Sequence, residues 1–133
     1  MALIDRRVSR RFSTTATGGA DDEVTHEVEE DATVEEIRIR FYPGPLLDLE
    51  LRPFVETDEG RRRDLVDVIG RETIVGDDDR FEFHISEDVR ESDVVGVEYV
   101  NNDAQNEYDF VVDMDFERAG GSSRIIDYLR GVF

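Results

Sequence analysis

The sequence has no cysteine, no tryptophan and no lysine, and it has only two histidines and three prolines. Without cysteine the chain can form no disulfide and no thiolate metal site. It contains no apolar run long enough to cross a bilayer, and its first thirty residues contain no apolar run of the signal-peptide type. We therefore expect neither membrane association nor secretion through a signal peptide.

Motifs of catalysis and cofactor binding are also missing. His26 and His84 accompany neither a Gly-x-Ser-x-Gly elbow nor a His-Glu-x-x-His zinc pattern, and no glycine-rich phosphate or dinucleotide loop is present. A pair of carboxylates could serve an acid–base hydrolase, but 34 acidic residues would provide such a pair by chance. We expect no enzymatic activity and no cofactor.

What the chain has in abundance is negative charge. The 34 acidic residues face 16 basic ones, all of them arginine, which gives a formal net charge of −18. Such a surface repels itself in dilute salt, whereas molar salt screens the repulsion within about 3 Å. The composition is typical of an extreme halophile. Acidic disorder is the competing interpretation, but the aromatic residues and alternating pattern from residue 34 onward favour a folded domain.

Alternation of apolar and polar residues is clearest in Ile37–Leu51, which contains two period-two runs around a Pro-Gly-Pro turn. This pattern predicts two half-buried strands. If they pair as an antiparallel hairpin, Arg40 faces Asp48 and Arg38 faces Glu50. The alternative is that the proline turn carries the chain across to a second sheet.

Further alternating runs follow at Phe81–Ser86, Val95–Val100 and Tyr108–Glu117, and the last two resemble a long hairpin. The pattern predicts an all-β fold, an antiparallel β-sandwich of jelly-roll type, over residues 34–119. We expect an extended N-terminal arm over residues 1–33 and a C-terminal tail with a short helix over residues 120–133.

The predicted arm contains four arginines that would form one patch if the segment were helical: Arg6, Arg7, Arg10 and Arg11. This patch could dock on an acidic neighbouring subunit or belong to a solvated, disordered tail. Contact with nucleic acid is disfavoured, because the chain is acidic and high salt weakens phosphate binding.

The predicted tail helix places apolar residues on one face: Ile125, Ile126 and Leu129, with Phe133 beyond the helix. A helix this short is not stable alone, so the tail either returns to its own core or inserts into a neighbouring subunit. The run Asp77-Asp78-Asp79 is a candidate for a hard cation, although it lacks the calcium-loop spacing and fits a hydrated turn.

Three segments resemble runs in small β-sandwich structural proteins of tailed viruses. They read FYPGPLLDLELRPFVE (Phe41–Glu56), GDDDRFEFHISEDV (Gly76–Val89) and VGVEYVNNDAQNEYDFVVDMDFE (Val95–Glu117). The resemblance covers roughly residues 34–119, and its motifs are structural rather than catalytic. With the halophilic composition, it implies a protein from a tailed virus of halophilic archaea.

The resemblance implies a virion structural protein of the decoration, vertex or turret type, assembled in the host cytoplasm. Its expected partners are other virion proteins, namely capsid or vertex subunits, and further copies of itself, bound through the arm and the tail. The alternative is a receptor- or carbohydrate-binding module of a viral or cell surface. Tyr42, in the proline turn, is the candidate for stacking on a sugar.

Overall fold

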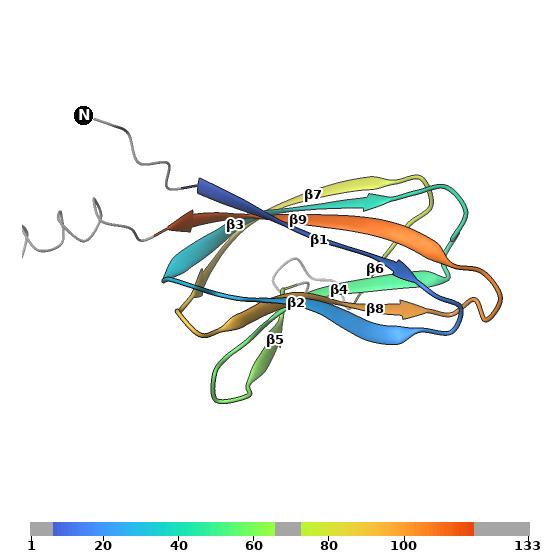
Figure 1. The fold of residues 1–133 in the computed structure, drawn as a ribbon. Helices are drawn as coiled ribbons and strands as arrows, with labels where there is room; N and C mark the ends of the chain where they lie inside the picture. Colours follow the sequence, from blue (N-terminus) through green and yellow to red (C-terminus); the bar gives the residue numbers. More distant parts are fainter. Residues whose placement is uncertain (1–6, 66–72, 119–133) are drawn as a thin grey trace, which may run out of the picture.

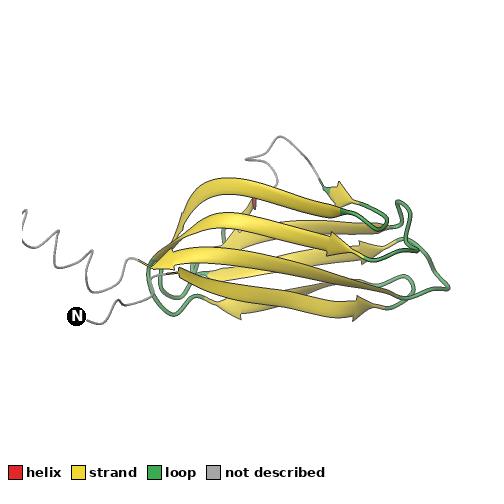
Figure 2. Ribbon diagram, turned by 90° about the horizontal axis from the view of Figure 1, so that it is seen from above, coloured by secondary structure: helices red, strands yellow, loops and turns green. Residues whose placement is uncertain are grey.

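Residues 7–65 and 73–118, which the computed structural model describes, form two antiparallel sheets packed face to face (Figures 1 and 2). Sheet 1 has the order β1-β9-β3-β7, and sheet 2 has the order β2-β8-β4-β5 with β6 paired to β4. The strands are β1 (Arg7–Ala16), β2 (Asp21–Glu27), β3 (Ala32–Phe41), β4 (Leu49–Glu56), β5 (Arg62–Asp64), β6 (Ile74–Val75), β7 (Arg80–Val89), β8 (Val94–Asn101) and β9 (Tyr108–Arg118).

The chain changes sheet at most of its connections. Each step from β1 to β4 and from β6 to β9 crosses between the sheets, and among the described strands only β4 and β5 are both consecutive and paired. This strand order is that of a jelly roll. The predicted antiparallel β-sandwich is therefore confirmed, and the apolar inner faces of both sheets form its core.

The proline turn carries the chain from β3 in sheet 1 to β4 in sheet 2, so the crossing alternative is correct and the hairpin is wrong. Arg38 and Arg40 consequently do not face Glu50 and Asp48. The predicted hairpin of Val95–Val100 with Tyr108–Glu117 is also wrong, because β8 and β9 lie in different sheets. Alternation identifies the buried face of a strand, but it does not identify the strand beside it.

The predicted N-terminal arm is a further correction, because most of it belongs to the sandwich. β1 pairs with β9 along its whole length, and β2 pairs with β8. Phe12 and Ala16 are buried in the core together with Val28. The alternation of apolar and polar residues does not mark these strands, because both lie at sheet edges, where small and polar residues occupy many inward positions. The predicted tail helix, including Ile125, Ile126, Leu129 and Phe133, lies outside the described residues.

Candidate functional site

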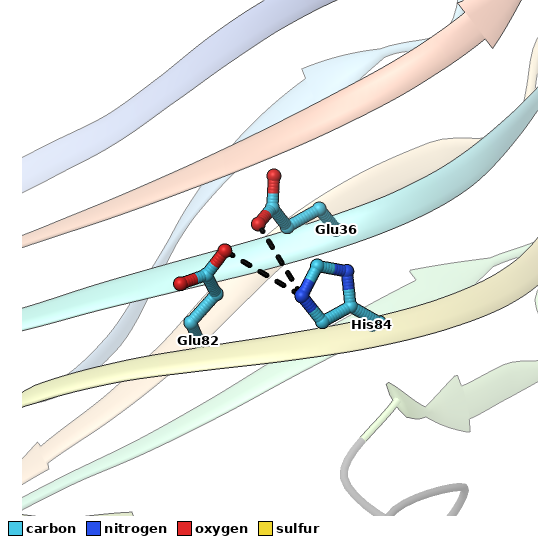
Figure 3. A group of neighbouring side chains, drawn as sticks. All are labelled: Glu36, Glu82 and His84. Atoms are coloured by element: carbon cyan, nitrogen blue, oxygen red, sulfur yellow. Dashed lines mark ion pairs between the residues drawn. The ribbon is translucent and has the colours of Figure 1, made fainter.

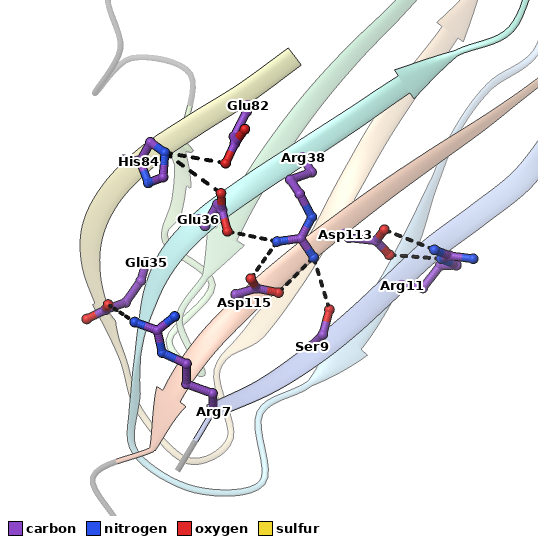
Figure 4. A network of polar contacts seen from close by, with 10 residues as sticks. All are labelled: Arg7, Ser9, Arg11, Glu35, Glu36, Arg38, Glu82, His84, Asp113 and Asp115. Atoms are coloured by element: carbon purple, nitrogen blue, oxygen red, sulfur yellow. Dashed lines mark hydrogen bonds and ion pairs between the residues drawn. The ribbon is translucent and has the colours of Figure 1, made fainter. Parts of the chain in front are cut away.

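Arginine–carboxylate pairs cover the outer face of sheet 1 (Figure 4). Arg38 donates to both carboxylate oxygens of Asp115 at 2.5 and 3.0 Å and to Glu36 Oε2 at 2.8 Å. Arg11 donates to both oxygens of Asp113 at 2.9 and 3.1 Å. The hydrogen bonds from Arg38 lower the pKa of Asp115, and the same contact raises the pKa of Arg38. These arginines neutralise acids of their own chain.

A β-bulge in β3 shapes this face. The register with both neighbouring strands shifts between Val34 and Glu36, while Val34 and Ile37 are both buried. One extra residue between them allows Glu35 and Glu36 to lie together on the outer face (Figure 4). The bulge therefore adds a carboxylate to a surface that would otherwise alternate strictly.

Glu36, Glu82 and His84 form a group of potential metal ligands on this face (Figure 3). One ligand atom from each lies within 4.8 Å of the others. His84 Nε2 lies 3.5 Å from Glu82 Oε1 and 3.8 Å from Glu36 Oε1, and the neighbouring Glu82 carboxyl raises the pKa of Glu36. Because Glu36 also binds Arg38 and the His84 side chain is 76% exposed, the group is an open surface cluster rather than an enclosed metal cage.

The candidate cation site at Asp77, Asp78 and Asp79 is not formed. Within the described residues these carboxylates do not converge on one point, and each has a different partner. Asp77 accepts hydrogen bonds from the β3–β4 loop, Asp78 pairs with Arg40 at 2.9 Å, and Asp79 Oδ2 accepts from the Asp77 backbone N–H at 2.8 Å. Their chemistry is that of a turn that supports the neighbouring loop.

That neighbouring loop, residues 42–48, carries the exposed large apolar side chains of the described structure. Leu46 is 65% exposed, Leu47 is 71% exposed and Tyr42 is 42% exposed. Leu46 has a φ of 53°, in the left-handed region that bulky residues rarely adopt. We call Leu46 and Leu47 the apolar tip. The adjacent leucines after Pro-Gly-Pro interrupt the alternation, and this was the signal in the sequence that could have identified them.

Hydrogen bonds hold the loop under the apolar tip. Asp77 Oδ1 accepts from the backbone N–H of Gly44 at 2.6 Å and of Leu46 at 3.3 Å. The Asp48 N–H donates to the Pro45 carbonyl at 2.9 Å, and the Asp48 carbonyl accepts from the Asn102 N–H at 2.8 Å. The leucines are thus presented on a backbone that is fixed before any partner arrives, which lowers the entropy lost on binding.

The adjacent loop between β8 and β9 is fixed in the same way. Asn101 is 1% exposed, and its Nδ2 lies at 2.8–3.1 Å from the carbonyl oxygens of Ala16, Thr17 and Asn106. Asp103 accepts from the Tyr108 hydroxyl at 2.5 Å and from the Asn106 side chain at 2.8 Å. These bonds hold the pKa of Asp103 well below its ordinary range, and Asp103 raises the pKa of Tyr108 to about 12.

The arginines of the predicted N-terminal patch do not share one face. β1 is a strand, so Arg7 and Arg11 lie on the outer face with Glu35 and Asp113 (Figure 4), whereas Arg10 is directed to the opposite side. The patch predicted for a helix is therefore wrong for these residues, and Arg6 lies outside the described residues. The described residues also contain no helix long and apolar enough to span a membrane.

No family model matches the sequence, and no curated protein matches it. Among solved structures, the crystal structure of a Yersinia pseudotuberculosis-derived mitogen is similar, with 9% identity and a TM-score of 0.53 over 80% of this chain and 84% of that one. At this identity the likeness shows a shared fold and says nothing about activity.

Two other solved structures have lower TM-scores. An infectious bursal disease virus chain (Gt strain) gives 0.45 at 10% identity; the alignment covers 88% of this chain but only 33% of the viral one. The Drosophila NLP core, a structure concerned with pentamer formation and histone binding, gives 0.40 at 12% identity over 80% of this chain and 97% of that one.

Proposed function

We propose that this chain is a non-enzymatic structural subunit of a virion that binds neighbouring protein subunits through the apolar tip. The observation that carries the proposal is the exposure of Leu46 and Leu47 on a loop that its own chain holds rigid. Burying a leucine side chain stabilises a contact by about 1.5–3 kcal/mol. A fixed loop retains more of that free energy, because less motion is lost on docking.

The setting of a tailed virus of halophilic archaea is supported by the sequence resemblance and by the acidic, lysine-free composition. In molar salt, ion pairs between exposed groups are strongly screened, whereas burial of apolar area is not. An acidic subunit that assembles under these conditions needs apolar contacts. The decoration, vertex and turret roles all require this kind of attachment to neighbouring subunits.

The test is a change at the apolar tip with a charge-matched control. The variant Leu46→Asp/Leu47→Asp should weaken association at least tenfold in molar NaCl, measured by sedimentation with itself and with particles from which this chain has been removed. Ala104→Asp/Gln105→Asp adds two acidic groups at exposed sites in the adjacent loop and should leave association unchanged.

The proposal fails if the tip variant associates as strongly as the unaltered chain. The carbohydrate-binding alternative would be supported if the chain remains monomeric, does not bind particles and binds a glycan on an array. Replacing Tyr42 by Ala would then identify whether the ring in the loop contributes to sugar binding. In that result the apolar tip would not be the functional surface.

A further inference from the structure

At the end of the sandwich opposite the apolar tip, a small hollow with a cavity volume of about 50 Å³ opens between β1 and β2. Its apolar lining comes from three strands of sheet 1 and from the connection between β2 and β3, namely Val8, Ala32, Phe116 and Val28. Charged and polar side chains surround it, namely Arg10, His26, Glu29, Glu30 and Arg118. We call this the edge pocket.

Arg10 distinguishes the edge pocket from the rest of the surface. Four arginines of the described residues make no ion pair or side-chain hydrogen bond, namely Arg10, Arg61, Arg80 and Arg90, and Arg10 is the only half-buried one among them. Its neighbour Arg118 already pairs with Glu30 at 2.9 Å. A half-buried cation beside an apolar pocket is suited to a ligand that combines an apolar group with a carboxylate.

The opposite end of the same chain has these two groups in sequence. Leu46 and Leu47 are exposed, and Asp48 follows them directly. The Asp48 carboxylate makes no ion pair or hydrogen bond within the described structure, although its backbone N–H and carbonyl are both bonded. The unpaired carboxylate beside the apolar tip complements the unpaired guanidinium beside the edge pocket.

We propose that the partner of the apolar tip is a second copy of this chain, whose edge pocket receives Leu47 while its Arg10 pairs with Asp48. This inference rests on the proposed function and specifies the partner and the surface. Tip and pocket lie at opposite ends of the sandwich, so the contact is head to tail. Repetition of such a contact produces a closed ring or an open filament.

The area of one contact is small, and single contacts of this size are transient. A closed ring would bury one tip and one pocket per subunit, and closure makes the last contact intramolecular. The Asp48–Arg10 pair would fix the register of the contact more than its strength, because it lies at the rim of the apolar patch.

The decisive experiment mixes two variants that are each defective at one end. Leu47→Asp removes the tip but keeps the pocket, and Val8→Glu/Arg10→Asp removes the pocket but keeps the tip. By sedimentation in molar NaCl each variant alone should be monomeric. At high protein concentration an equimolar mixture should show a concentration-dependent rise in average mass toward a one-to-one dimer and no further, because each pair of chains has only one intact tip and one intact pocket and the single contact is weak.

A charge exchange tests the proposed ion pair. Asp48→Arg and Arg10→Asp each place two like charges opposite each other in the contact, so each should weaken self-association about tenfold, and the double variant should recover most of it. Arg90→Asp is the control, because Arg90 is another unpaired arginine in a turn near the same end and does not line the edge pocket. Circular dichroism of each variant verifies that the sandwich is folded.

The inference is overturned if, at the highest concentration measured, the mixture of the two variants has the same average mass as each variant alone. It is also overturned if Arg10→Asp assembles normally while Leu47→Asp does not, and in that case the proposed function survives with a different partner for the tip. Another outcome is that removal of residues 119–133 weakens self-association as much as Arg10→Asp does, while the tip variants leave it unchanged. In that case the edge pocket receives that segment rather than a second copy. If the unaltered chain associates neither with itself nor with particles, the proposed function itself is contradicted.

Discussion

The sandwich has two ends, seen at the two sides of Figure 1, and their charged side chains have different roles. At the tip end, Asp77 and Asp103 accept hydrogen bonds from nearby loops and hold them in one conformation. At the pocket end the 90–93 turn is held similarly by Asp93, whereas Arg10 has no hydrogen-bond or ion-pair partner within the described residues. Carboxylates that bind their own chain make one end rigid, and the unpaired cation leaves the other end able to receive a ligand.

The strongest way to break this contrast is to remove the buried amide that joins the loops of the tip end. Asn101→Ala should lower the free energy of unfolding by about 3 kcal/mol, because buried carbonyl oxygens lose their donor. Urea unfolding in molar NaCl measures the change. Asn102→Ala is the control, since its exposed side chain donates only to Glu50, and it should change stability by less than about 1 kcal/mol. If both variants lose the same free energy of unfolding, the Asn101 side-chain amide does not hold the loops of this end together.

A smaller effect is expected when the support of the apolar tip is removed. Asp77→Ala deprives the Gly44 and Leu46 amides of their acceptor and should cost about 1–2 kcal/mol, since water replaces part of the lost bonding. Amide hydrogen exchange at Gly44 and Leu46 should become faster. Asp58→Ala, in an exposed turn at the other end, should change neither quantity. Unchanged exchange at both amides would contradict the supporting role.

Replacing the strained leucine should separate stability from association. Leu46→Gly relieves a left-handed conformation worth about 1–2 kcal/mol, and glycine returns about half of that through its greater freedom in the unfolded chain. We expect a net gain of about 0.5–1 kcal/mol in thermal or urea unfolding together with weaker self-association. Leu47→Gly has no such strain to relieve and should weaken association without a gain in stability. A loss of stability in Leu46→Gly would show that the side chain supports the fold.

The smallest effect concerns the titration of Tyr108. Because its pKa is raised to about 12, the neutral phenol stabilises the fold fully below about pH 10, and this contribution is lost as the pH rises through 12. Asp103 has a lowered pKa, so its contribution is present above about pH 4 and is lost as the pH falls toward its folded value.

Asp103→Asn should move the Tyr108 titration down toward about 10, as measured by phenolate absorbance. Asp48→Asn should produce a smaller shift in the same direction, because Asp48 acts on Tyr108 only through its charge. A Tyr108 titration unaffected by Asp103→Asn would mean that this hydrogen bond does not hold the β8–β9 loop.

Alternation of apolar and polar residues was sufficient to predict the strands β3, β7, β8 and β9 and their buried faces. Large apolar residues such as Ile39, Phe110 and Val112 mark the inner faces of these strands. It failed for β1, where Arg10 and Thr14 occupy inward positions that an edge strand tolerates. It also failed to assign partners, since acidic strands offered Arg38 several equivalent pairings. The apolar tip depends on a turn conformation and on Asp77, more than thirty residues away in the sequence, which no local pattern reveals.

The position of β9 between β1 and β3 has a consequence for folding during synthesis. β1 pairs in sheet 1 only with β9, and its register joins Arg7 to Glu117. During synthesis β1 must therefore wait until nearly the whole sandwich has left the ribosome before it finds its neighbour. Such distant pairing makes folding slow, and the unfinished chain is exposed to aggregation.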